Sequence, residues 1–346
     1  MSGTSLDGLD IALCQLDQSN EQWSYQLLKT STSPYHPDLK SKLQQAVHLN
    51  GLDLQKLHRS YGLWLSAQVN NFIEHNGCQP DLIASHGHTV FHEPNKRINF
   101  QVGDGHVIAA QTGITTISDF RSLDICLNGQ GAPLVPIGDQ LLFGSYAACV
   151  NLGGFANVSC TIDGNRKAWD ICPVNFVTNR LMQQVNKDMD YNGELGKTGH
   201  IITALLEQLN ALSYYGDNAP KSLAQEWVDS EFMPLLDTYK SHPLKNLLRT
   251  CYEHFATIIS NDLNTLPEGE ILFTGGGVYN IYLMQLIKQK TRHQVMVPKA
   301  DLIEFKEALI FALLGVLRIT GHINCLSSVT GADCDSSSGI IHWGRK

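Results

Sequence analysis

The sequence predicts an α/β protein of two domains, with mixed sheets flanked by helices. Strand-like apolar runs alternate with segments of helical periodicity along much of the chain. The 346 residues are enough for two domains that each have a core of their own. A segment rich in glycine and proline, residues 128–133, interrupts the pattern and marks the expected domain boundary.

The first ten residues contain glycines, hydroxyl side chains and the carboxylates of Asp7 and Asp10. Small residues let backbone N–H groups come close to an anion, and hydroxyls add further donors. Carboxylates fit beside a phosphate only if a divalent cation, usually Mg²⁺, lies between them. With strands expected at residues 11–16 and 23–28, the stretch predicts a phosphate–metal loop on a β-hairpin. An ordinary polar turn fits the same residues.

Two helical patterns follow, at residues 37–49 and 54–75, and a short buried strand at residues 81–85 opens the α/β alternation. His86 and His88, just after this strand, would point the same way on an extended chain. Such a pair is half of several metal sites. Because the sequence shows no second half, we interpret these histidines as polar groups offered to a ligand.

The next two strands, at residues 99–104 and 115–120, flank a short helix. Arg121 follows the second of them, and ligands of parallel α/β sheets gather at the carboxyl ends of strands. Its planar guanidinium makes Arg121 a candidate clamp for an anion. A structural ion pair with Asp119 or Asp124 explains the same arginine equally well.

The second half begins with a helix expected at residues 137–144 and then places strands at residues 147–152 and 157–162. Gly153 and Gly154 form the turn between these strands. A glycine turn between strands repeats the arrangement at the start of the chain, so we expect a second ligand-binding turn here.

A third strand, residues 167–169, ends at Asp170. A carboxylate at this point, ahead of a helix that starts near Asn175, suits a catalytic base, and it also suits a helix cap. The polar, glycine-punctuated region at residues 189–223 is expected to form loops and short helices over a cleft.

A strand at residues 270–273 leads into Gly275, Gly276 and Gly277. Three glycines between a strand and a helix let the backbone pass close to a flat or charged ligand, such as a nucleotide. The sequence contains neither the P-loop nor the Rossmann glycine pattern. The other regular segments predicted are helices at residues 244–266, 279–290 and 304–317 and strands at residues 294–297 and 339–343.

The formal net charge is −8 and no run of lysine or arginine occurs, which argues against nucleic acid as the main partner. No apolar stretch approaches the ~20 residues of a membrane helix. The start lacks the basic and apolar regions of a signal peptide. Nine cysteines without a C-x-x-C pair indicate reduced thiols, so we expect a cytoplasmic protein.

Glycine turns after strands in both halves resemble those of the sugar kinase/Hsp70/actin superfamily. Its ATP lies in a cleft between two domains of the actin-like ATPase (ribonuclease H-like) fold. A closer resemblance, to the anhydro-N-acetylmuramic acid kinases, runs over nearly the whole chain. The matching segments are SGTSLDGLD at 2–10, QVGDG at 101–105, DFR at 119–121, GQGAPLVP at 129–136, NLGGFAN at 151–157, TGGG at 274–277 with Asn280, EA at 307–308 and SVTGA at 328–332. Eight matches in one order are far more specific than any single motif.

The resemblance implies an N-terminal domain of residues 1–131 plus about 327–346, which carries the first phosphate loop. Residues 132–326 would then hold the second phosphate hairpin, the catalytic aspartate and the adenosine loop. It also implies a reaction in which ATP, Mg²⁺ and water open 1,6-anhydro-N-acetylmuramic acid and phosphorylate O6. The product is N-acetylmuramic acid 6-phosphate, in cell-wall recycling. Relatives suggest a homodimer.

Position by position, the resemblance makes Asp170 the base that takes a proton from the water attacking C1. Arg121, Thr89 and Glu307 match positions that contact the sugar, with Arg121 at its lactyl carboxylate. Asp7, or else Asp10, would lie near Mg²⁺ through water. The residues expected around ATP are Gly3, Thr4, Ser5, Leu6, Asp7, Gly8, Leu9, Asp10, Gly153, Gly154, Gly275, Gly276 and Gly277.

The sequence departs from the family near the expected active site. The family's Asp-Thr-Gly-Pro-Gly-Asn loop is here Asp170-Ile171-Cys172-Pro173-Val174-Asn175, so two glycines gain side chains. If those glycines held positive φ, Cys172 and Val174 would force a changed path. An arginine is missing from the family's Pro-Lys-Ser-Thr-Gly-Arg-Glu pattern at residues 220–226. The strand that precedes the first loop is also missing, so either the start is truncated or another strand fills its place.

Two hypotheses for the function follow from these matches and departures. The first is an active kinase of the anhydro-sugar, and the second is a catalytically weak relative that binds nucleotide or sugar. Retention of Asp170, Arg121 and the first loop favours the kinase, whereas the altered loop at residues 170–175 favours the binding protein.

Overall fold

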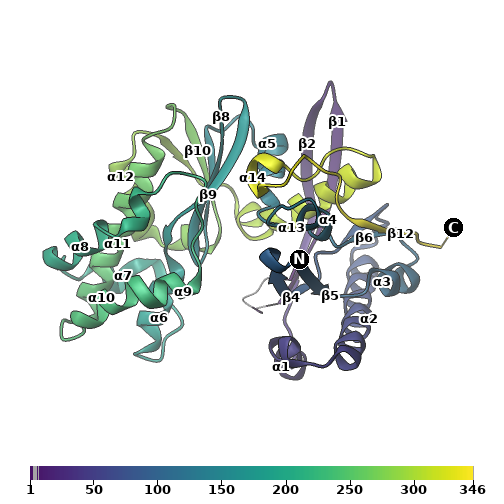
Figure 1. Cartoon of the computed structure of the whole chain (residues 1–346), viewed down its shortest axis with the longest axis horizontal. Helices are drawn as coiled ribbons and strands as arrows, with labels where there is room; N and C mark the ends of the chain where they lie inside the picture. The colour runs from purple at the N-terminus through teal and green to yellow at the C-terminus, as the bar shows by residue number, and fades with distance from the viewer. Residues whose placement is uncertain (3–5, 7, 346) are drawn as a thin grey trace. The chain divides into compact units, whose positions relative to one another are not determined.

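The computed structural model describes residues 1–2, 6 and 8–345. The chain forms two compact units, which Figure 1 shows coloured along the sequence. Unit 1 comprises Met1–Leu142 and Phe305–Lys346, and unit 2 comprises Phe143–Glu304.

The unit boundaries lie near residues 142 and 304, whereas the sequence led us to expect them near 131 and 326. Packing explains both positions. The segment that contains Leu134 and Ile137 shares a core with Ile310 and Leu314 of the late helix, so both segments belong to unit 1.

Unit 1 is built from two hairpins, a small sheet and helices packed against them. The hairpins, both antiparallel, are β1 (Leu9–Ser19) with β2 (Gln22–Ser33) and β4 (His88–Glu93) with β5 (Ile98–Val102). In the small sheet, β6 (Thr116–Ser118) lies between the parallel β3 (Ile83–Ala84) and the antiparallel β12 (Ile340–His342). The helices are α1 (Pro37–Gln44), α2 (Gly51–Asn76), α3 (Gly105–Thr112), α4 (Ser122–Cys126), α5 (Val135–Leu142), most of α13 (Ala300–Ile319) and α14 (Ser327–Thr330).

Helix α2 shows how local chemistry sets the helix ends. The Asn50 side chain accepts a hydrogen bond of 3.0 Å from the backbone N–H of Asp53, which satisfies one of the free donors of the first turn. The helix ends at Gly77, whose φ of 59° is the left-handed conformation that glycine adopts without strain.

A cavity of about 590 Å³ with both apolar and polar lining residues lies within unit 1, between β1, α2, β3 and α13. Ile11, Leu13, Val69, Phe72 and Phe311 are among its lining residues. Over the described residues β1 pairs with β2, and β3 pairs with β6. Within that same part of the chain, the other edge of β3 has no strand neighbour. The other edge of β1 is paired only at its start, where Leu9 and Asp10 contact the first two residues.

Unit 2 is organised around one mixed sheet with the strand order β11-β10-β7-β8-β9. The strands are β7 (Ala148–Leu152), β8 (Phe155–Ile162), β9 (Asn165–Pro173), β10 (Glu270–Thr274) and β11 (Gln294–Met296). The first three in the chain form an antiparallel meander, and the last two add parallel to β7. This is the ribonuclease H-like sheet that the resemblance implies, and it confirms the predicted α/β class.

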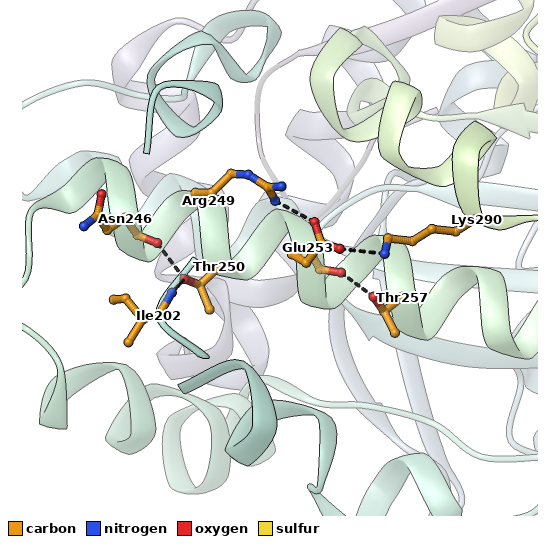
Figure 2. Close-up of polar contacts among 7 residues, drawn as sticks. All are labelled: Ile202, Asn246, Arg249, Thr250, Glu253, Thr257 and Lys290. Carbon is orange, nitrogen blue, oxygen red and sulfur yellow. Dashed lines mark hydrogen bonds and ion pairs between the residues drawn. The ribbon is translucent and has the colours of Figure 1, made fainter. Parts of the chain in front are cut away.

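The helices of unit 2 bury one face of this sheet in a large core. They are α6 (Asn175–Gln183), α7 (Glu194–Lys197), α8 (Thr203–Asn210), α9 (Gln225–Trp227), α10 (Met233–Thr238), α11 (Leu244–Leu263) and α12 (Ile281–Lys290). Figure 2 shows the polar contacts that hold α11. The Glu253 carboxylate accepts from Arg249 (2.7 Å) and from Lys290 of α12 (2.6 Å), and Thr250 accepts from the backbone N–H of Ile202.

None of the helices that the structure describes combines the length and the apolar character needed to cross a membrane.

Candidate active site

Four residues expected around ATP lie outside the described residues, namely Gly3, Thr4, Ser5 and Asp7. Asp7 is also the carboxylate that was expected first near Mg²⁺. Leu6 and Leu9 are both buried in the core of unit 1. Their side chains therefore anchor the loop in the protein, and only their backbone groups remain for a ligand.

Gly8 and Asp10 are held against the neighbouring strand β2. A Cβ atom on Gly8 would lie 2.8 Å from the carbonyl oxygen of Ser33, so only glycine fits there without a shift. Asp10 accepts a 2.6 Å hydrogen bond from the Thr32 hydroxyl through one carboxylate oxygen. Among the described residues no side chain bonds its second oxygen, which suits a cation or a water.

Arg121 makes neither of the two ion pairs that the sequence left open. Its Nε and Nη2 atoms lie 3.1 and 3.0 Å from Nε2 of His86, and Nη1 donates to the carbonyl of Gly131 at 2.7 Å. Asp119 instead accepts from Ser122, and Asp124 accepts from Gly131 and Thr330. The arginine is half-buried, and its side chain is left available as an anion clamp.

Glu307 belongs to the same electrostatic neighbourhood as Arg121. The Glu307 residue is exposed at the surface of unit 1, but desolvation by the protein around its carboxyl raises the pKa of that group. The charges of Arg121 and of the Met1 amino group oppose this rise. Burial lowers the pKa of the Met1 amino group to about 6, and Asp10 and Glu307 oppose this. Two of the three expected sugar contacts are thus brought together.

The third expected sugar contact, Thr89, lies on β4. Its hydroxyl accepts from the Gln101 side chain at 3.3 Å, and Gln101 in turn bonds Asn99 on β5. Thr89 is half-buried, and within the described residues no contact links it directly to Arg121 or Glu307.

The histidine pair of this loop is used inside the protein. His86 contacts Arg121, and His88 lies 3.4 Å from the Ser2 hydroxyl. Among the described residues no three His, Cys, Asp or Glu side chains gather as a metal site would require.

Asp170 stands on β9 of unit 2, on the sheet face opposite the hydrophobic core. Strand pairing places it across from Asn157, which is itself paired with Asn151 on β7. Paired residues share one face of a sheet, so these three polar side chains form a row. The row lies on the face opposite the core, because the residues next to Asp170 in the chain, Trp169 and Ile171, are buried in the core.

The Asp170 backbone and carboxylate are fixed by the segment around Lys221. The backbone N–H of Asp170 donates to Lys221 O (3.0 Å), and the N–H of Leu223 donates to the carboxylate (2.8 Å). The Tyr214 hydroxyl donates to the Asp170 carbonyl at 2.7 Å. Burial raises the pKa of the Asp170 carboxyl, and the Leu223 hydrogen bond partly opposes this shift. A half-buried carboxylate with a raised pKa is suited to take up a proton.

The altered loop after Asp170 accommodates its two new side chains inside the core of unit 2. Neither Cys172 nor Val174 has a positive φ, and both side chains are buried in the core of unit 2. A register shift in the β8–β9 pairing leaves Ile171 without an opposite residue, so Ile171 and Cys172 both face the core. The new side chains therefore point away from the face that carries Asp170.

Gly153 and Gly154 form the turn between β7 and β8. Their carbonyls accept from the backbone N–H groups of Val174, Asn175 and Phe176, which ties the turn to the loop after Asp170. A Cβ atom at Gly154 would make only one ordinary contact, 3.7 Å from Phe176. The protein itself does not require glycine there, and the open space leaves room for a ligand to approach the backbone.

The three later glycines have different roles. Gly275 has φ of 84°, and Cβ atoms on Gly275 and Gly277 would lie 2.7 and 2.8 Å from the carbonyl oxygen of Leu152 at the end of β7. Gly276 is exposed and has open space around it. Because β10 runs parallel to β7, this turn and the Gly153–Gly154 turn meet at the same end of the sheet.

The structure adds two residues that sequence reasoning did not single out, Asn151 and Asn157. It also gives His86, which was expected only as a polar group offered to a ligand, a contact with Arg121. The signal for the two asparagines was present, because they flank the glycine turn of a predicted hairpin and so share one face of it. The contact of His86 with Arg121 joins residues from two separate strand ends and gave no local signal.

Comparisons with known proteins find similarity along nearly the whole sequence. The profile of the anhydro-N-acetylmuramic acid kinase family matches residues 1–344. A protein of that name from Bacillus cereus is 32% identical over 364 residues, covering 96% of this chain and 95% of its own length. One from Bacillus thuringiensis (strain Al Hakam) is also 32% identical, covering 96% and 94%.

Similarity to solved structures is much weaker. A ROK family glucokinase from Streptomyces griseus, in complex with glucose and AMPPNP, is 11% identical, with a TM-score of 0.36 over 83% of this chain and 94% of that one. The family assignment therefore rests on the sequence matches.

Proposed function

Since the chain belongs to the anhydro-N-acetylmuramic acid kinase family, we propose that it catalyses the reaction after which the family is named, with ATP as the phosphoryl donor. Water attacks C1 of 1,6-anhydro-N-acetylmuramic acid, the C1–O6 bond breaks, and O6 takes the γ-phosphoryl group. The products are ADP and N-acetylmuramic acid 6-phosphate.

The observation that best supports this proposal is the position of Asp170. It is a half-buried carboxylate with a raised pKa on the sheet face opposite the core. Its row with Asn157 and Asn151 is separated from the turn of Gly153 and Gly154 by a single residue pair. In the proposed mechanism Asp170 takes the proton that water loses as it attacks C1. Asn157, directly across from it, offers a side-chain amide on the same face.

The glycine turns of unit 2 are proposed to hold the nucleotide. Gly154 and Gly276 leave open space, so their backbones allow phosphates or adenosine to come close. In unit 1, the backbone of residues 3–10 is proposed to wrap the phosphates, with Asp7 or Asp10 near Mg²⁺ through water. The carboxylate oxygen of Asp10 is a ligand type that Mg²⁺ prefers. When bound, the ion would neutralise phosphate charge.

The sugar is proposed to contact Arg121, Glu307 and Thr89, with Arg121 at its carboxylate. This assignment is supported by the availability of the guanidinium, since neither Asp119 nor Asp124 occupies it. The resulting activity would belong to cell-wall recycling in the cytoplasm. The nine free cysteines fit a reducing compartment. A homodimer is proposed from the resemblance alone.

Turnover is tested by incubating the protein with ATP, Mg²⁺ and the anhydro-sugar while measuring ADP release and the mass of the product. We expect a phosphorylated, hydrated sugar, and a loss of about 10²–10⁴-fold in kcat for Asp170→Asn. ATP or sugar binding by calorimetry without turnover in the wild type would instead support the binding-protein hypothesis.

A further inference from the structure

The Arg121 side chain is oriented by a single uncharged ring. Nε2 of His86 lies 3.1 Å from Nε and 3.0 Å from Nη2 of the guanidinium. The carbonyl of Gly131 accepts a third N–H at 2.7 Å. Both partners of the arginine are therefore neutral acceptors.

The contacts of His86 define its protonation state. Arginine can only donate, so Nε2 of His86 must present a lone pair. Nδ1 lies 3.0 Å from the carbonyl of Gly87, so it carries the ring proton. Burial, together with the charge of Arg121, lowers the pKa of His86 to about 3. The ring also packs edge-on against Phe311, with centroids 4.9 Å apart, which fixes its plane.

The geometry leaves part of the guanidinium for a ligand. A guanidinium has five N–H donors, and three of those on Arg121 are used by His86 and Gly131. One donor remains on each terminal nitrogen. Two donors on adjacent nitrogens suit a two-point contact with a carboxylate.

Because His86 is neutral, it also leaves the positive charge of Arg121 unchanged. An aspartate or glutamate in the place of His86 would orient the arginine equally well but would cancel its charge and compete with an incoming carboxylate. The nearby carboxyls do not take that place. Asp119 and Asp124 accept from other groups, and the described contacts include no ion pair between Arg121 and Glu307.

We propose that His86 is a positioning residue for the sugar's carboxylate: it aims Arg121 at that group without placing a negative charge against the guanidinium. The inference rests on the proposed function, because it takes the lactyl carboxylate of the anhydro-sugar as the anion. It adds to that function a residue that acts through Arg121 and does not touch the substrate.

Steady-state kinetics test the proposal with a series of variants at position 86. His86→Ala should raise the KM for 1,6-anhydro-N-acetylmuramic acid about tenfold or more, the scale expected for a misplaced charge-assisted contact. The KM for ATP should stay within about twofold. His86→Gln, which keeps a neutral acceptor, should recover part of the loss, and His86→Glu should be the weakest sugar binder because its carboxylate competes. His75→Ala, at an exposed histidine of α2, is the matched control.

A second substrate separates positioning from general damage. 1,6-Anhydro-N-acetylglucosamine lacks the lactyl carboxylate, so its kcat/KM should be the same for wild type, His86→Ala and His86→Glu. Melting curves identify any variant that fails to fold, and His86→Gln then supplies the comparison.

The outcomes distinguish this inference from the proposed function. Wild-type turnover of the muramic sugar with an unchanged KM in His86→Ala and His86→Glu would overturn the inference alone. An equal loss on both sugars would do the same. Absence of wild-type turnover would overturn the proposed function, and the inference with it.

Discussion

The proposed role of Asp170 as a base predicts how the activity depends on pH. Because burial raises the pKa of its carboxyl, the carboxylate needed as a base is lost at a higher pH than for an ordinary aspartate. We expect kcat/KM for the sugar to fall on the acid side, with an apparent pKa above the usual range near 4. A pH–rate profile checks this, and a flat profile down to pH 4 would contradict the assigned role.

The same shift predicts the stability of the Asp170→Asn variant. A carboxyl whose pKa is raised by folding costs stability once the pH exceeds its unfolded value, since the folded state disfavours the charge. Removing that charge at pH 7 should leave the Tm unchanged or higher. A clearly lowered Tm would show that the carboxylate is structural and would undermine the activity comparison.

Gly275 and Gly276 give a matched pair of substitutions. Gly275→Ala places a Cβ atom at φ of 84° and 2.7 Å from Leu152 O, so we expect a loss of about 1–3 kcal/mol in stability. Gly276→Ala meets open space and should change stability by less than about 0.5 kcal/mol. It should nevertheless raise the KM for ATP, if that backbone lies against the nucleotide. Urea unfolding and ATP kinetics on both variants measure the two effects, and an unchanged ATP KM in Gly276→Ala would count against the adenosine assignment.

At the scale of single residues, the sequence predicted identities better than contacts. Arg121 was found from its place after a strand, but its partner could not be deduced, because His86 reaches it from a different strand end. The buried orientation of Cys172 and Val174 depends on an extra residue in the β8–β9 pairing, and register shifts leave no mark in local hydrophobic periodicity.

Among the elements, α11 is fixed by charge as well as by apolar packing. Burial alone would raise the pKa of Glu253, but the charges of Lys290 and Arg249 outweigh it and lower the pKa. The carboxylate therefore contributes stability above about pH 4.5, and this is lost as the pH falls through the lowered pKa. Its side chain is only 14% exposed, so solvent screens the contacts weakly.

Glu253→Ala should accordingly cost about 1–2 kcal/mol of unfolding free energy at pH 7. The difference from wild type should shrink near pH 3. Chemical denaturation at the two pH values measures both quantities, with Glu207→Ala on the exposed side of α8 as the control. An equal cost at both pH values would show that packing, not charge, ties α11 to α12.

The elements with strong periodicity were predicted well. The strand at residues 147–152 is β7 (Ala148–Leu152), and the helix at 304–317 lies within α13 (Ala300–Ile319). β4 (His88–Glu93) was missed because two histidines and a glutamate leave it only a short apolar run, and its partner β5 supplies the pairing that makes it a strand. The short α4 (Ser122–Cys126) was missed as well, since one turn is too short for a periodic signal.

At the scale of the whole molecule, the reactivity of the cysteine thiols shows which of them are buried. All nine cysteines are free, and Cys126 and Cys334 are the exposed ones. Ellman's reagent should therefore label about two thiols quickly in the native protein and all nine after denaturation, and dithiothreitol should leave the Tm unchanged. A Tm that drops with reductant would reveal a disulfide and argue against a reducing compartment.

The two-part α/β organisation was predictable from length and alternation, whereas the limits of the two parts were not. The chain returns to unit 1 at α13 because Ile310 and Leu314 pack beside Leu134 and Ile137, some 170 residues earlier. No local feature of the sequence announces a contact of that separation. The composition break at residues 128–133 marks a turn inside unit 1 instead.

The margins of β1 and β3 that no described strand covers have a practical consequence for handling the protein. Beyond its first two residues, β1 presents a row of amide and carbonyl groups that no described strand covers, and such an edge is a template for a strand from another molecule. In warm or concentrated solutions we therefore expect aggregation to start at unit 1. In any fibrous precipitate the hairpin of β1 and β2 should form the contacts between molecules.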